Sequence, residues 1–124
     1  MQKTLLYFIF ISSLYSGMIQ HSNIKNSLEN KDIKVEVLIN EIIKNIKNVI
    51  LYYKSNDQIK FLQKNMIHTN NNFFNTTIPK QYVTSNGINY YVLLELNDNS
   101  IYSFPYDNPI ENPIIIKIIS SQKN

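Results

Sequence analysis

The chain has 124 residues and a mass of 14.6 kDa, which suits one small domain. Its 12 basic residues, all of them lysine, exceed the 9 acidic residues by three and are spread along the chain without a run. Because arginine supplies the bidentate contacts that dominate nucleic-acid interfaces, its absence argues against a nucleic-acid partner. The absence of cysteine excludes a disulfide framework, a cysteine-ligated zinc site and a thiol nucleophile.

The start of the chain has the layout of an export signal or a membrane anchor. Lys3 is followed by an uninterrupted apolar run over residues 5–11. A short basic start followed by such a run is typical of a secretory signal. Ser16 and Gly17 are small residues at which a signal peptidase can cut, and retention of the segment as an anchor is the alternative. We therefore expect residues 1–20 to form a signal peptide or a membrane anchor.

A polar connector and then an amphipathic helix are expected next. Residues 21–31 are rich in asparagine and serine, which is typical of a connecting segment. From Val35 to Tyr53, apolar residues recur at spacings of three and four, and polar residues fill the opposite positions. This spacing predicts an amphipathic helix with Asp32 as its N-cap. Residues 32–124 are expected to form one domain.

The second half of the chain is typical of β-strands. Ile88–Leu96 is the strongest candidate because it is rich in aromatic and β-branched residues. A turn over residues 97–99 leads to a partner strand at Ser100–Phe104, and Ile114–Ile119 supplies another. These strands predict an antiparallel meander of three to four strands. With the helix packed on one face of that sheet, the predicted fold is α+β.

Tyrosines are the best candidates for an interaction surface. Tyr90 and Tyr91 are adjacent on one predicted strand, so they must face opposite sides of the sheet. Together with Tyr102 and Tyr106, they can contribute to an aromatic patch that contacts another protein. The alternative interpretation is ordinary cross-strand packing of aromatic side chains.

Residues that would carry chemistry are sparse. The two histidines are 47 positions apart, and the two glycines exclude phosphate-binding loops and dinucleotide fingerprints. We therefore expect no metal, no cofactor and no enzymatic activity. A small hydrolase remains a third hypothesis, because four carboxylates near the predicted strand ends can supply an acid–base pair. They are Glu95, Asp98, Asp107 and Glu111.

Two short segments of the chain carry a family resemblance. The helix end Asn48–Tyr53 and the segment Ile78–Val92, with its glycine followed by aromatic residues, resemble the corresponding parts of pilin-like accessory proteins of thin type IV pili, particularly the PilM family. The order of apolar start, polar connector, helix and strands is similar as well. The resemblance implies a small protein at the inner membrane, facing the periplasm, that has protein partners in pilus assembly. No site residue is carried over from it.

The expected function is therefore contact with other proteins rather than catalysis. The first hypothesis is a membrane-anchored, envelope-exposed protein of type IV pilus assembly, held at the membrane through residues 1–20. The alternative is a freely secreted or periplasmic small binding protein with no catalytic activity, which follows if that segment is removed. Retention or loss of these residues separates the two hypotheses.

Overall fold

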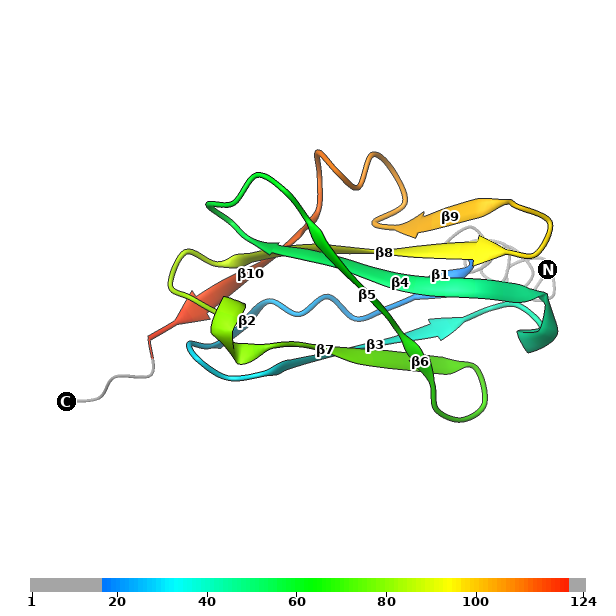
Figure 1. The fold of residues 1–124 in the computed structure, drawn as a ribbon, viewed down its shortest axis with the longest axis horizontal. Coiled ribbons are helices and arrows are strands. Elements are labelled where there is room, and N and C mark those ends of the chain that lie inside the picture. Colours follow the sequence, from blue (N-terminus) through cyan, green and yellow to red (C-terminus); the bar gives the residue numbers. More distant parts are fainter. Residues whose placement is uncertain (1–16, 121–124) are drawn as a thin grey trace, which may run out of the picture.

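Two β-sheets form the protein in a computed structural model that describes residues 17–120 (Figure 1). One sheet has four strands in the order β1-β3-β7-β6. The other has six strands in the order β2-β10-β8-β4-β5, with β9 also paired to β8. The elements are β1 (Ile19–Gln20), β2 (Asn26–Leu28), β3 (Ile33–Ile39), η1 (Ile43–Asn45), β4 (Ile46–Ser55), β5 (Leu62–Asn65), β6 (Ile67–His68), β7 (Phe73–Ile78), η2 (Lys80–Tyr82), β8 (Ile88–Leu96), β9 (Ile101–Phe104) and β10 (Ile114–Ile119), where η marks a short 3-10 helix.

The predicted amphipathic helix is wrong, because its residues form the two strands β3 and β4. Burial alternates along β3, so that its odd-numbered residues face the interior and the even-numbered ones do not. The same period of two runs through β4 from Val49 to Ser55. The helical spacing passed over Val37 and Leu51, both of which are buried. β-Branched residues dominate this region and fit a pleated surface better than a helix, which explains the outcome.

The predicted α+β class is therefore wrong as well, although the later strands were placed correctly. β8 and β10 have the predicted bounds, and β9 begins one residue later than expected. The predicted simple meander does not form, because β8 pairs with both β9 and β10 along one edge. The described chain is thus an all-β sandwich with two single-turn 3-10 helices.

The connections repeatedly carry the chain from one sheet to the other. β1 pairs with β3, and the chain then crosses to place β2 in parallel beside β10. Further on, β5 and β6 form one diagonal crossing, in which β5 pairs with β4 and β6 with β7 (Figure 1). With β2 and β5 set aside, the strand order corresponds to the two sheets of an immunoglobulin-like sandwich. Such a strand order by itself says nothing of function.

The core lies between the two sheets and is made mostly of branched aliphatic side chains. Its fully buried members come from both sheets and from the loop before β8, and Tyr90 is the largest of them. Burial of this apolar surface is the main stabilising contribution to the fold. The largest fully buried side chains are Tyr90, Ile39, Leu51, Ile78, Ile88, Leu94, Ile116, Val35, Val37, Val83 and Val92.

The structure contradicts the pilin-like layout and gives no support to the signal-anchor interpretation. The pilin-like layout needs a long helix after the apolar start, yet the residues predicted to form it lie in strands β3 and β4, and the longest helices within residues 17–120 have three residues. No helix in this range has the length and apolar character needed to cross a membrane. The end of the predicted 1–20 segment forms strand β1, and the connector 21–31 contains β2. The rest of the predicted signal or anchor, residues 1–16, lies outside the described residues.

Candidate binding surface

The outward side of the six-stranded sheet, called the outer face below, carries apolar side chains at its centre. On the two central strands, the register places outward side chains in four successive cross-strand pairs. These pairs are Lys54 with Asn89, Tyr52 with Tyr91, Ile50 with Leu93, and Asn48 with Glu95. The two middle pairs are apolar and the two end pairs are polar or charged. Since the solvent side of an antiparallel sheet is normally polar, the apolar centre marks this face as unusual.

An aromatic cluster forms the centre of the outer face. The Tyr52 and Tyr91 rings are stacked, with centroids 4.7 Å apart and an interplanar angle of 6°. Phe61 meets Tyr91 edge-on at 5.0 Å, and the Lys54 ammonium lies 5.3 Å from the Phe61 ring centroid. Burial raises the pKa of the Tyr91 hydroxyl, and the nearby Tyr52 raises it further. Tyr91 is therefore uncharged at neutral pH, and a lysine lies at the edge of the cluster.

The two ends of the outer face have opposite charge character. At one end, Asn48 Nδ2 donates to Glu95 Oε1 at 3.1 Å, and Lys47 Nζ lies 3.5 Å from Glu95 Oε2. At the other end, Lys54 Nζ donates to the Gln58 carbonyl oxygen at 2.9 Å, a neutral acceptor. The Lys54 charge thus has no carboxylate within ion-pair distance in the part of the chain that the structure describes.

Asn89, which shares the Lys54 end, is an unusual buried polar residue. It is 8% exposed, and its Oδ1 has no hydrogen-bond partner among residues 17–120. A buried acceptor without a donor costs about 1–3 kcal/mol. Ile115 of β10 lies opposite Asn89 and is mostly exposed, and Ile101 of β9 lies opposite Glu95 at the other end. The outer face therefore exposes aliphatic surface at both ends, whereas the unsatisfied Asn89 acceptor is buried beneath it.

The outward side of the four-stranded sheet differs from the outer face. Its cross-strand pairs on β3 and β7 are Lys34 with Thr77, Glu36 with Asn75, and Leu38 with Phe73. Two of these three pairs are polar, and the apolar pair lies at one end. The two faces of the sandwich are therefore not equivalent, and adjoining apolar pairs flanked by polar pairs occur on the outer face.

The structure separates the four tyrosines predicted to form an interaction surface. Tyr90 is fully buried in the core, whereas Tyr91 lies on the outer face and is 5% exposed. Tyr102 pairs with Leu94, whose side chain points inward, so Tyr102 projects from the opposite side to Tyr91 and is 39% exposed. Tyr106 is 84% exposed in the loop after β9. Tyr91 is thus the predicted residue that belongs to the outer face.

Three of the four carboxylates proposed for acid–base chemistry are held by hydrogen bonds to neighbouring side chains or backbone. Asp98 Oδ1 accepts hydrogen bonds from the Ser100 hydroxyl at 2.5 Å and the Ser100 amide at 3.0 Å, and these bonds lower the Asp98 pKa. Glu95 is held by Asn48 and Lys47, as described above. Glu111 accepts from Asn108 Nδ2 at 3.0 Å in the same loop that contains Asp107. No cluster of three metal-binding side chains occurs within residues 17–120.

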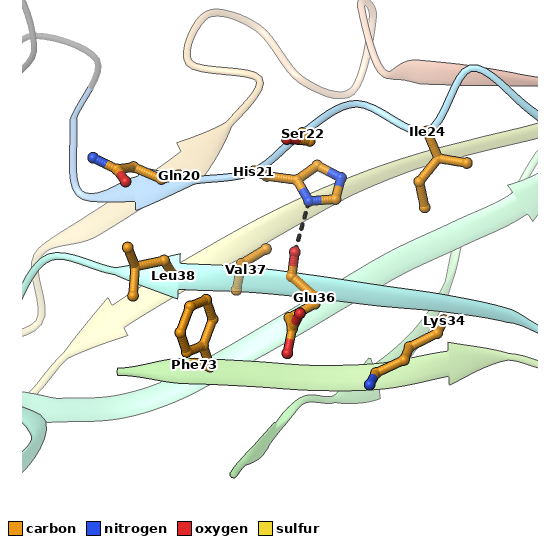
Figure 2. Close-up of a pocket in the computed structure, with 9 residues that line it drawn as sticks. All are labelled: Gln20, His21, Ser22, Ile24, Lys34, Glu36, Val37, Leu38 and Phe73. Carbon is orange, nitrogen blue, oxygen red and sulfur yellow. Dashed lines mark hydrogen bonds between the residues drawn. The ribbon is translucent and has the colours of Figure 1, made fainter. Parts of the chain in front are cut away.

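A groove of about 550 Å³ lies beside β3, where the chain leaves β1 to reach the other sheet (Figure 2). His21 projects across it, and its Nδ1 lies 2.8 Å from the carbonyl oxygen of Glu36, which can only accept, so Nδ1 carries the proton. The other ring nitrogen, Nε2, accepts from the Tyr90 hydroxyl at 2.6 Å. That hydroxyl in turn accepts from the Ile24 amide at 3.2 Å. The network fastens residues 21–24 to both sheets.

The environment of this network keeps both side chains neutral. Burial lowers the His21 pKa below its ordinary value, and the bond to the Glu36 carbonyl only partly offsets that effect. Burial also raises the Tyr90 pKa to about 12. Because both ring nitrogens of His21 are engaged, neither is free to exchange a proton with a ligand in the groove. We therefore assign this network a structural role.

Three residues of the outer face escaped the sequence analysis. Tyr52, Lys54 and Phe61 were placed in or beside a predicted helix, where they could not be matched with Tyr91 across a strand pair. The pattern that could have identified them is the alternation of buried and outward residues along β4. That alternation has a period of two and therefore indicates a strand rather than a helix. Asn89 gave no signal, since asparagine is common throughout the chain.

Comparison with known proteins adds no assignment to this geometry. The chain matches no known protein family, and no curated protein sequence matches it significantly.

Proposed function

We propose that this protein is a non-catalytic binding module that contacts another protein through its outer face. The observation that carries the proposal is two adjoining apolar cross-strand pairs, Tyr52 with Tyr91 and Ile50 with Leu93. They lie between two polar cross-strand pairs. An apolar centre with a polar rim is the usual anatomy of a protein interface. Tyrosine is also among the residues that contribute most to such interfaces.

Of the two functions expected from the sequence, binding by a freely exported protein keeps more support. The pilus-assembly hypothesis depended on an N-terminal helical layout, and the described residues form a sandwich instead. Binding by protein contact does not depend on that helix. The favoured hypothesis is therefore a small secreted or periplasmic binding protein, with the partner at the outer face.

Export itself is a separate part of the proposal. A cut near Ser16 or Gly17 would leave β1 intact, including the pairing of Ile19 with Ile39. The intact mass of the protein from the native host tests this step. A chain shortened near Ser16 in the exported fraction supports export with cleavage, and full-length chain confined to the cytosol contradicts it.

Affinity capture from the exported fraction of the native host tests the binding surface. The bait proteins are the wild type, Tyr52→Glu on the outer face, and Leu38→Glu as a matched control on the other sheet. Both substitutions put a charge at a half-buried, outward strand position. We expect the wild type and the control to retain the same protein and the Tyr52 variant to lose it. Equal retention by all three baits would contradict the proposal.

A further inference from the structure

We propose that the partner at the outer face is a second copy of this chain, forming a symmetric dimer. The inference rests on the proposed function and names the partner of the same surface. The two faces stack with a two-fold axis in the plane of the interface, perpendicular to the strands. This operation reverses the strand direction of one copy relative to the other. The four cross-strand pairs of one outer face therefore meet the four pairs of the other in opposite order.

The order of the cross-strand pairs makes the outer face complementary to itself under this operation. The Tyr52–Tyr91 pair of each copy lies against the Ile50–Leu93 pair of the other copy. Two sheets packed in this way lie about 10 Å apart with their side chains interdigitated. Apolar side chains therefore cover apolar side chains at the centre of the interface.

Charge complementarity selects this orientation over the parallel one. The operation brings Lys54 of each copy to the end where Glu95 of the other copy lies. Within its own chain, Lys54 has a carbonyl oxygen rather than a carboxylate as its acceptor. Glu95 is part-exposed and its ion pair with Lys47, at 3.5 Å, is on the surface, so it can accept a second cation. The alternative axis, parallel to the strands, would place the two Lys54 side chains together.

The size of the face predicts a dimer of modest affinity. Four strand widths of about 4.8 Å and about eight residues of about 3.3 Å each cover roughly 500 Å² per copy. The total of roughly 1,000 Å² lies at the lower limit for a specific interface. We expect a concentration-dependent equilibrium between monomer and dimer rather than a permanent assembly.

Sedimentation equilibrium with paired charge reversals tests this arrangement. Lys54→Glu alone sets two carboxylates against each other at both ends of the interface, and Glu95→Lys alone places two lysines together. Each variant should dimerise at least tenfold more weakly than the wild type. An equimolar mixture of the two restores opposite charges at both ends, so it should recover dimers that neither variant forms alone. Lys34→Glu, on the other sheet, is the matched control and should leave the wild-type equilibrium unchanged.

The outcomes separate this inference from the proposed function. Recovery in the mixture supports the dimer, and its absence from a mixture of two folded variants overturns the proposed orientation. Leu93→Lys, which charges the apolar centre, provides a second route if a reversal variant does not fold; wild-type affinity in that variant would overturn the dimer. A wild type that stays monomeric at all concentrations, but whose captured protein is lost on Tyr52→Glu, refutes the dimer while the proposed function stands.

Discussion

The Tyr90 hydroxyl makes two hydrogen bonds at the edge of the core, and Tyr90→Phe removes it without changing the shape of the ring. In the wild type it donates to His21 Nε2 at 2.6 Å and accepts from the Ile24 amide at 3.2 Å. The variant leaves both partners without their bond. Its ring keeps the edge-on contact with His21, whose centroid lies 5.6 Å away. The substitution therefore isolates the contribution of the hydrogen bonds.

The expected loss of unfolding free energy is about 2 kcal/mol. Each buried group left without a partner costs about 1–3 kcal/mol, and the full penalty would apply if both groups stayed dry. His21 and the backbone at Ile24 border the groove, so water there can satisfy part of what is lost. A value near 2 kcal/mol lies between these limits and changes the folding equilibrium constant about 30-fold.

Urea unfolding at pH 7.5, followed by circular dichroism, measures this loss. Tyr102→Phe is the matched control, because its hydroxyl has no hydrogen bond to any of residues 17–120 and its side chain is partly exposed. We expect the control to change stability by less than about 0.5 kcal/mol. If Tyr90→Phe were as stable as the control, the network would not fasten residues 21–24 to the sandwich, and its structural role would be refuted.

Three further predictions follow from the same architecture. The folded-state pKa of His21 lies below its ordinary value of 6.5, so the unfolded chain binds the proton more readily. Stability that is present above pH 6.5 is therefore lost as the pH falls from 6.5 through the lowered folded-state pKa. His21→Gln should remove that part of the slope in urea unfolding from pH 7.5 to 5, and an unchanged slope would contradict the assignment. Gly87, directly before β8, has φ +95°, and a Cβ there would lie 3.2 Å from the Ile116 backbone oxygen. Gly87→Ala should therefore lower the free energy of unfolding by about 1–3 kcal/mol in thermal unfolding. A neutral effect would contradict the positive φ at this position. Val37→Ala should cost about 2 kcal/mol and Leu38→Ala less than about 1 kcal/mol in the same assay, whereas the reverse order would favour a helix over β3.

The strands of the second half were predictable because their sequences carry two agreeing signals. Ile88–Leu96 combines aromatic and β-branched residues with turn residues on both sides, and β8 has these bounds. The turn at residues 97–99 also forms, with Asn99 in the left-handed region at φ 73°. Where local composition and turn chemistry point to the same structure, sequence alone suffices.

The first half was mispredicted because two strands in succession imitate a helical stripe. Val35 and Ile39 are four apart, and so are Ile46 and Ile50, so both pairs fit helical spacing as well as strand alternation. The residues that decide between the two are Val37 and Leu51, whose burial fits a period of two. Ile42, which lies between the two strands, continued the apolar spacing and hid the break between them.

The binding surface was only partly predictable for a related reason. The opposite orientation of Tyr90 and Tyr91 follows from strand geometry, and the structure confirms it. The sequence did not reveal the partners of Tyr91, because its stacking with Tyr52 depends on the pairing of β4 with β8. The two tyrosines are 39 positions apart in the sequence. Long-range register is not encoded in any local pattern of this chain.

Photo-cross-linking in the native host tests the central claim that the outer face is the binding surface. A photoreactive phenylalanine analogue replaces Leu93 at the centre of the outer face or, in the control, Leu38 on the outward side of the other sheet. We predict a discrete cross-linked product from position 93, either with a second copy or with another protein, and no such product from position 38. Products from position 38 alone, or equal products from both positions, would contradict the account.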